Sequence, residues 1–156
     1  MLENLVFGNK ELHLDYKTRV GVYAVIFNER KDQVLVIRSD RGGFFLPGGG
    51  MEAKENHSEC LKREMLEETG FEVSIGEYLG QAQKYHLAMG KLPTLSHAHF
   101  YIATLGEKRQ KPVEVDEAPI WINTVEVESL LFHEHQVWGV KQAFNKFGYD
   151  KEKDCL

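Results

Sequence analysis

Glu64, Glu67 and Glu68 have the spacing of residues on neighbouring turns of one helix face. At about 100° per residue, their side chains fall within a sector of roughly 100°. Glu64 and Glu68 lie four residues apart, so their like charges destabilise an isolated helix by roughly a few tenths of a kcal/mol. A hard divalent cation held by oxygen ligands would offset that repulsion.

A solvated acidic helix face is the alternative interpretation of these three glutamates. His57 and Cys60 fall in the same angular sector of the helix. Because a free cysteine is usually buried, this face is expected to be partly enclosed. An enclosed cluster of carboxylates favours metal binding over simple solvation.

The surrounding segment, residues 49–71, resembles the Nudix box, G-x5-E-x7-R-E-U-x-E-E-x-G-U, where U is a bulky apolar residue. Seven of its positions demand one residue type, so at about 7% usage each a chance match is on the order of 10⁻⁸ per window. Every fixed position is filled without departure, by Gly49, Glu55, Arg63, Glu64, Met65, Glu67, Glu68, Gly70 and Phe71.

The resemblance implies a metal site that uses Mg²⁺ or Mn²⁺. In this family the carboxylates matching Glu64, Glu67 and Glu68 bind the metals, and the backbone carbonyl of the glycine before the box, here Gly48, adds a ligand. In some members the carboxylate matching Glu64 is the general base. Oxygen ligands are the ones that these hard cations prefer.

Arg63 could be a surface partner of Glu59 or Glu67, since both lie four residues away. By resemblance it pairs instead with Glu55, and a planar guanidinium can orient a carboxylate through two hydrogen bonds. Glu55 would also be favoured by the helix dipole, and both roles are compatible. Gly49, Glu55 and Gly70 are thus expected to support the site.

Other family members often add an acid from a loop beyond the box. Glu114, Asp116 and Glu117 all lie in a suitable stretch before Trp121. No motif decides among the three, and we favour Glu117.

Two further groups of side chains have no motif to assign them. His97 and His99 alternate along an expected strand, so they either line a pocket or satisfy polar groups of the core. Candidates for stacking on a base, with core packing as the default interpretation, are Phe44, Phe45, Tyr85, Tyr101 and Trp121.

Composition narrows the class of protein. The chain has 156 residues, 42% hydrophobic and 28% charged, which predicts one soluble domain over residues 1–156. The formal net charge of −5 argues against stable nucleic-acid binding. The absence of a signal-like segment or a long apolar run predicts a protein that does not enter the membrane, and two unpatterned cysteines favour the cytoplasm.

The pattern of apolar residues predicts the strands and helices that position the box. Strands are expected over 19–27, 34–37, 71–83, 97–105 and 120–122, with 34–37 as hairpin partner of the first. Residues 48–50 are expected to form a flexible loop and 90–93 a connecting loop. Asn56 and Glu59 form a capping-box pattern and Gly70 a helix stop. Further helices are expected over 125–131 and 135–147.

This order predicts an α+β fold, a mixed β-sheet between helices, and the resemblance implies the same α/β/α sandwich. The expected activity is that of a MutT-like nucleotide pyrophosphatase. Water attacks phosphorus in a small-molecule nucleoside diphosphate linked to another group. A non-catalytic nucleotide or ADP-ribose sensor is the alternative, and an isomerase is a third. Substrate identity and homo-oligomer formation stay open.

Overall fold

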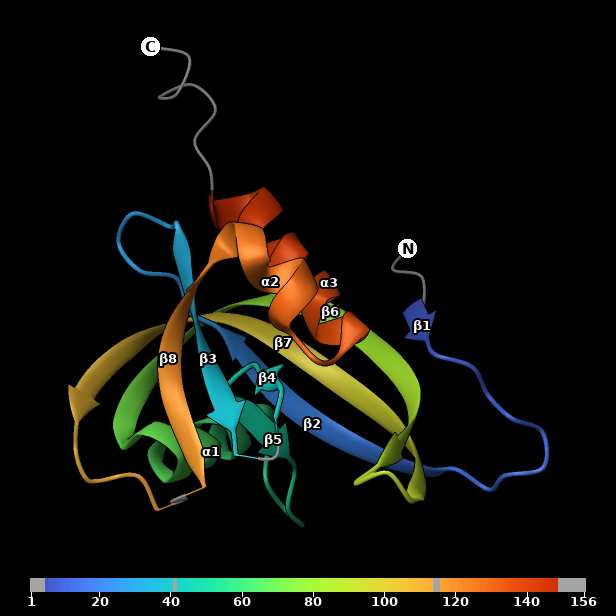
Figure 1. The fold of residues 1–156 in the computed structure, drawn as a ribbon. Coiled ribbons are helices and arrows are strands. Elements are labelled where there is room, and N and C mark those ends of the chain that lie inside the picture. The colour runs from blue at the N-terminus through green and yellow to red at the C-terminus, as the bar shows by residue number, and fades with distance from the viewer. Residues whose placement is uncertain (1–4, 41, 114–115, 149–156) are drawn as a thin grey trace.

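The computed structural model describes residues 5–40, 42–113 and 116–148. Two sheets meet in it, a five-stranded one in the order β1-β6-β7-β2-β5 and a three-stranded one in the order β4-β3-β8 (Figure 1). The strands are β1 Leu5–Phe7, β2 Lys17–Val25, β3 Gln33–Ser39, β4 Phe44–Phe45, β5 Gly48–Gly50, β6 Phe71–Ala88, β7 Leu92–Lys108 and β8 Glu117–Asn123. The helices are α1 His57–Thr69, α2 Val127–Leu130 and α3 Glu134–Ala143.

The larger sheet is mixed, as predicted. β2 pairs with β7 in parallel, whereas β6 with β7 and β2 with β5 are antiparallel. Helix α1 lies on one side of this sheet and α2 and α3 lie on the other (Figure 1). The fold is therefore the expected α+β sandwich. Among the described helices, none combines the length and apolar character needed to cross a bilayer.

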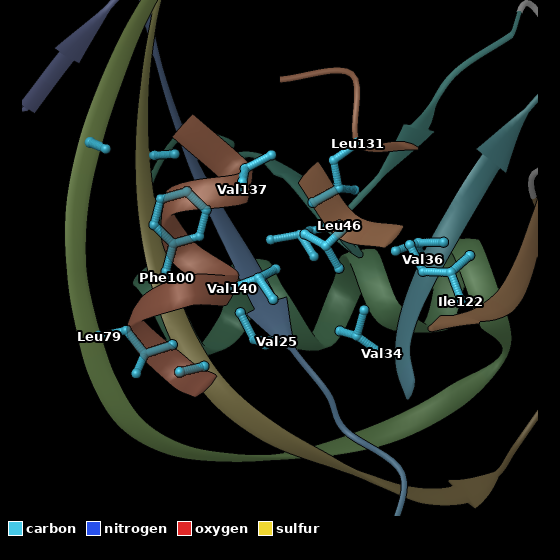
Figure 2. Close-up of a cluster of buried hydrophobic side chains, with 14 residues drawn as sticks. Val25, Val34, Val36, Leu46, Leu79, Phe100, Ile122, Leu131, Val137 and Val140 are labelled. Carbon is cyan, nitrogen blue, oxygen red and sulfur yellow. The ribbon is translucent and has the colours of Figure 1, made fainter. Parts of the chain in front are cut away.

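Each side of the sheet has its own hydrophobic core. Under α1, the buried side chains of Cys60, Leu61 and Met65 pack against strand residues such as Val22 and Ala24. The second core fills the space between α3 and both sheets, and Figure 2 shows its members Val25, Val34, Leu46, Phe100, Val137 and Val140. Because the two cores are separate, α1 and α3 are anchored independently to opposite faces.

The ends of α1 confirm the capping prediction. The Asn56 side chain accepts a hydrogen bond from the Glu59 backbone N–H at 2.8 Å, and the Glu59 carboxylate accepts one from Asn56 N at 3.1 Å. Gly70 ends the helix in the left-handed region, with φ +78°. The box helix thus begins and ends at sequence-encoded residues.

Two predictions about the strands are wrong. β3 is no hairpin partner of β2, because β7 and β5 already occupy both edges of β2. β3 pairs instead with β4 and β8. The segment after β2 contacts β3 through the antiparallel bridge between Phe27 and Val34 and through backbone hydrogen bonds from Leu35 N to Ile26 O and from Asn28 N to Gln33 O. Residues 48–50 form strand β5 against β2 rather than a free loop.

The long hairpin and the C-terminal helix also differ from the expected bounds. β6 and β7 pair as far as Ala88 and Leu92, so Pro93 lies in a strand, not in the connecting loop. The expected helix over 135–147 is α3 followed by a π-helical turn, Phe144–Gly148. Over 125–131, the short helix α2 confirms the prediction.

Helix α3 approaches the sheet closely at Gly139. A Cβ built there would lie 2.6 Å from Cδ1 of Phe100, a fully buried ring. We expect Gly139→Ala to lower the free energy of unfolding by about 1 kcal/mol or more, because overpacking outweighs the gain in helix propensity. Urea denaturation measures the change, with the exposed Lys141→Ala as control. An increase in stability for Gly139→Ala would contradict this packing.

Candidate active site

The glycine strand β5 and the carboxylates of α1 come together at one point of the fold. The Gly48 backbone N–H donates to Glu68 Oε1 at 2.8 Å, and Glu68 is only 6% exposed. A Cβ on Gly49 would lie 2.6 Å from the carboxylate carbon of Glu64. The two glutamates, four residues apart on the helix, therefore both reach the backbone of this strand.

Gly48 requires glycine for steric reasons, whereas Gly49 and Gly50 leave space that the side chains of Glu64 and Arg19 occupy. Gly48 has φ +136°, and a Cβ there would lie 2.1 Å from the Val22 carbonyl oxygen. At Gly50, a Cβ would lie 2.6 Å from Nε of Arg19. Since successive residues of a strand face opposite sides, Glu64 approaches one face of β5 and Arg19 approaches the other.

Arg63 donates hydrogen bonds to several groups in and around the box. Its Nε and Nη2 donate to the two oxygens of Glu55 at 2.6 and 2.9 Å, which is the predicted bidentate contact. Nη1 also donates to Glu64 at 3.0 Å and to Glu67 at 3.2 Å. Nη2 donates to the Gly50 carbonyl at 3.0 Å, so one side chain joins the helix, the preceding turn and the glycine strand.

The contact between Arg63 and Glu55 shifts the pKa of both side chains. The hydrogen bonds from the Arg63 guanidinium, with one from the Glu52 backbone N–H, lower the pKa of Glu55 from 4.5 to about 2. The carboxylate of Glu55 in turn raises the pKa of Arg63. Burial raises the pKa of Cys60 to about 11, with help from the Glu55 and Glu64 charges, so this buried thiol stays protonated.

A cavity of about 710 Å³ opens beside the glycine strand, between the two sheets. Of the predicted site residues, Gly48, Gly49 and Glu68 line it. The wall also includes Arg19, Tyr23, Ile37, Ser39, Asp40, Phe45, Leu46, Met89, Val113, Asp116, Glu117, His133 and Gln136.

Two of the three loop acids reach this cavity. Asp116 and Glu117 line it, whereas Glu114 lies outside the described residues. Oε2 of Glu117 is buried and has no hydrogen-bond partner. A buried carboxylate oxygen without a donor is costly, so a ligand that offers a donor or a positive charge would be stabilised there.

The donor chemistry around β5 fits a hard divalent cation. The Glu68 carboxylate and the Gly48 backbone lie on the cavity wall, and the Glu64 carboxylate lies against Gly49 of the same strand. Carboxylate and carbonyl oxygens are the ligands that such a cation prefers. In the arrangement described, Glu64 and Glu67 are bonded to Arg63, and the described residues include no group of three acidic, histidine or cysteine side chains already set to hold a metal ion. Metal binding would therefore involve movement of these carboxylates relative to Arg63.

Most of the other sequence candidates lie away from the cavity. His97 and His99 cluster with His57, with ring centroids 4.8 Å (His97–His99) and 4.3 Å (His57–His99) apart. Phe45 lines the cavity, but Tyr85 packs edge-on against Tyr16.

His133 is a cavity residue that the sequence did not indicate. Burial, with smaller effects of His135, Lys84 and His86, lowers its pKa to about 2, so His133 is neutral at pH 7. Lys84 Nζ lies 3.3 Å from its Nδ1. Because an ammonium group can only donate, Nδ1 accepts and the ring proton is on Nε2. No spacing pattern marks His133, because it precedes α3 and reaches the cavity only through the tertiary fold.

Comparison with known proteins agrees with the geometry. The family model described as NUDIX domain matches residues 17–145. A Bacillus subtilis protein named "Putative 8-oxo-dGTP diphosphatase" is 34% identical over 64 residues, which cover 41% of this chain and 43% of that protein. Human diphosphoinositol polyphosphate phosphohydrolase 3-alpha is 40% identical over 55 residues, 34% of each chain. These matches thus cover less than half the length of the curated relatives.

Solved structures resemble this chain over its whole fold, although their sequences differ widely from its sequence. A NUDIX hydrolase from Nitrosomonas europaea superposes with a TM-score of 0.71 at 17% identity, covering 90% of this chain and 96% of that one. At this identity the likeness concerns the fold alone.

The Arg63–Glu55 contact should be visible in a pH titration. Since the pKa of Glu55 is lowered in the folded state, its stabilising effect is complete above about pH 4.5 and is lost as the pH falls towards about 2. At about pH 3.5, the Glu55 carboxyl signal in ¹³C NMR should still be that of the ionised form. Arg63→Lys should move the midpoint towards 4.5, because lysine cannot form the fork. An unchanged midpoint would mean that Arg63 is not the cause.

Proposed function

Because the chain belongs to the NUDIX domain family, we propose that it is a metal-dependent hydrolase of a nucleoside diphosphate linked to another group. Water would attack phosphorus in the diphosphate, and the products would be a nucleoside monophosphate and a second phosphate-bearing fragment. The observation that carries the proposal is the shared cavity wall, which is lined by Glu68 of the box, by Gly48 just before it and by Glu117 of β8.

The proposed ligands of Mg²⁺ or Mn²⁺ are the carboxylates of Glu64, Glu67 and Glu68 and the carbonyl of Gly48. A cation held there supplies positive charge for the phosphate oxygens and makes a water molecule a better nucleophile. Glu68 reaches the cavity while it is bonded to Gly48 N, so the strand orients this carboxylate. Assignment of Glu64 as the general base stays a prediction.

Arg63 is proposed to position these groups rather than to touch substrate. Its fork on Glu55 and its bond to the Gly50 carbonyl hold the strand in place against the helix. The left-handed Gly70 ends α1 immediately after the carboxylates. Gly49 leaves the space that the Glu64 carboxylate occupies.

Glu117 is proposed as the further acid of the site, in preference to Asp116. Both line the cavity, but Glu117 has the buried, unpartnered oxygen, whereas Asp116 is exposed. Glu114 lies outside the described residues.

The wider setting of the activity is also a proposal. We expect residues 1–156 to act as one domain in the cytoplasm on a small molecule, without stable nucleic-acid binding. Adjoining cores that share the larger sheet support a single domain, and the net charge of −5 supports a small-molecule partner. The names of the relatives, an 8-oxo-dGTP diphosphatase and a diphosphoinositol polyphosphate phosphohydrolase, are those of proteins acting on phosphorylated small molecules.

Turnover of a nucleotide panel tests the proposal against the sensor alternative. Hydrolysis should require Mg²⁺ or Mn²⁺ and stop in chelator, and Glu68→Gln should lower kcat by roughly 10²–10³-fold, the usual cost of one lost transition-state contact. Glutamine keeps an oxygen acceptor for Gly48 N, so the circular dichroism spectrum should not change.

Full activity in chelator would contradict the metal mechanism. Retention of more than about a tenth of the activity by Glu68→Gln would count against ligation by Glu68. Tight nucleotide binding without turnover of any substrate would favour the sensor.

The choice of Glu117 is tested by a matched pair of variants. Glu117→Gln should lower kcat by about 10-fold or more, whereas Asp116→Asn should have a smaller effect. Both variants remove one negative charge from the same cavity wall. The reverse order of effects would assign the role to Asp116.

A further inference from the structure

Arg19 occupies a defined position on the cavity wall. It lies on β2, two residues before Gly21, which pairs with Gly50, and four before Tyr23, which pairs with Gly48. Arg19, Gly21 and Tyr23 alternate along the strand and so face the same side of the sheet. The Arg19 guanidinium lies against Gly50, with Nε 2.6 Å and Nη2 2.8 Å from the position of a Cβ there.

The guanidinium of Arg19 is a charged group of the cavity wall. Of the ion pairs between described residues, none includes Arg19. Among the described residues that line the cavity, it is the one with a permanent positive charge, since His133 is neutral at pH 7. The other charged groups of the wall are Asp40, Glu68, Asp116 and Glu117.

A cation in this position is suited to an anionic ligand. A guanidinium can donate two parallel hydrogen bonds to one phosphate, and the Arg19 guanidinium lies against Gly50 on the cavity wall. Glu64 lies on the opposite face of β5 from Arg19, whereas Glu68, another proposed metal ligand, shares the cavity with Arg19.

Resting on the function proposed above, we propose that Arg19 binds a phosphate of the substrate that lies outside the diphosphate linkage that water cleaves. Preferred substrates then carry anionic charge beyond the cleaved linkage, as a nucleoside triphosphate or another polyphosphate does. A nucleoside diphosphate joined to a neutral sugar offers no such group and is a poorer substrate.

The test compares Arg19→Gln with wild type on a nucleoside triphosphate and on the sugar ester of the same nucleoside diphosphate. Wild type should prefer the triphosphate. In Arg19→Gln the KM for the triphosphate should rise at least about 10-fold with kcat little changed. The reason is that Arg19 would bind this phosphate equally in the ground state and in the transition state. The KM for the sugar ester should stay within about 3-fold. Arg19→Lys should recover part of the loss, since lysine keeps the charge but not the fork.

Lys17→Gln is the matched control, because Lys17 lies on the same strand, is exposed and does not line the cavity. Equal effects of Lys17→Gln and Arg19→Gln, or equal loss on both substrates, would overturn the proposal. Calorimetry with inorganic tripolyphosphate and Mg²⁺ gives a second measurement, in which Arg19→Gln should bind at least about 10-fold more weakly.

The two proposals fail in different ways. If wild type hydrolyses no substrate, the proposed function is wrong, and the tripolyphosphate titration still decides whether Arg19 binds phosphate. If wild type is active and Arg19→Gln behaves as wild type in both measurements, the assignment of Arg19 is wrong while the hydrolase activity stands.

Discussion

The arrangement of the site depends on how one guanidinium distributes its hydrogen bonds. Arg63 bonds to Glu55 before α1, to Glu64 and Glu67 on α1, and to the Gly50 carbonyl of β5. Without this positive charge, acidic side chains that are 13% to 35% exposed would repel one another next to an apolar core. The strand can approach the helix so closely because Arg63 neutralises the carboxylates and supplies donors at the same time.

The parts that could be predicted from sequence are those that local chemistry determines. Helix α1, its Asn56 cap and its Gly70 end follow from residue types at fixed spacing, and so does the Arg63–Glu55 fork once the box is recognised. Pairing between distant strands could not be predicted in this way. The apolar run of β3 suits a neighbour of β2 and an element of a second sheet equally well, and the choice depends on β7 and β5 occupying β2.

The same limit applies to the cavity. The cavity residues Arg19 and His133 are 114 residues apart along the chain, with Glu117 between them. Nothing in their local sequence relates the three. They line one cavity because the tertiary fold brings residues of β2, β8 and the start of α3 to it. Glu117 was favoured among three loop acids without a motif, and its buried Oε2 is a property of the tertiary fold.

The separation of the two cores has a consequence for how such a protein can diverge. The box helix rests on the α1 core and is bonded to β5, whereas other parts of the cavity wall belong to β2, β3, β8 and the start of α3. Substitutions at Arg19, Phe45, Met89 or His133 alter the wall and leave the contacts of Arg63 intact. Natural selection can therefore change what the pocket accommodates while the box helix and the contacts of Arg63 are inherited unaltered.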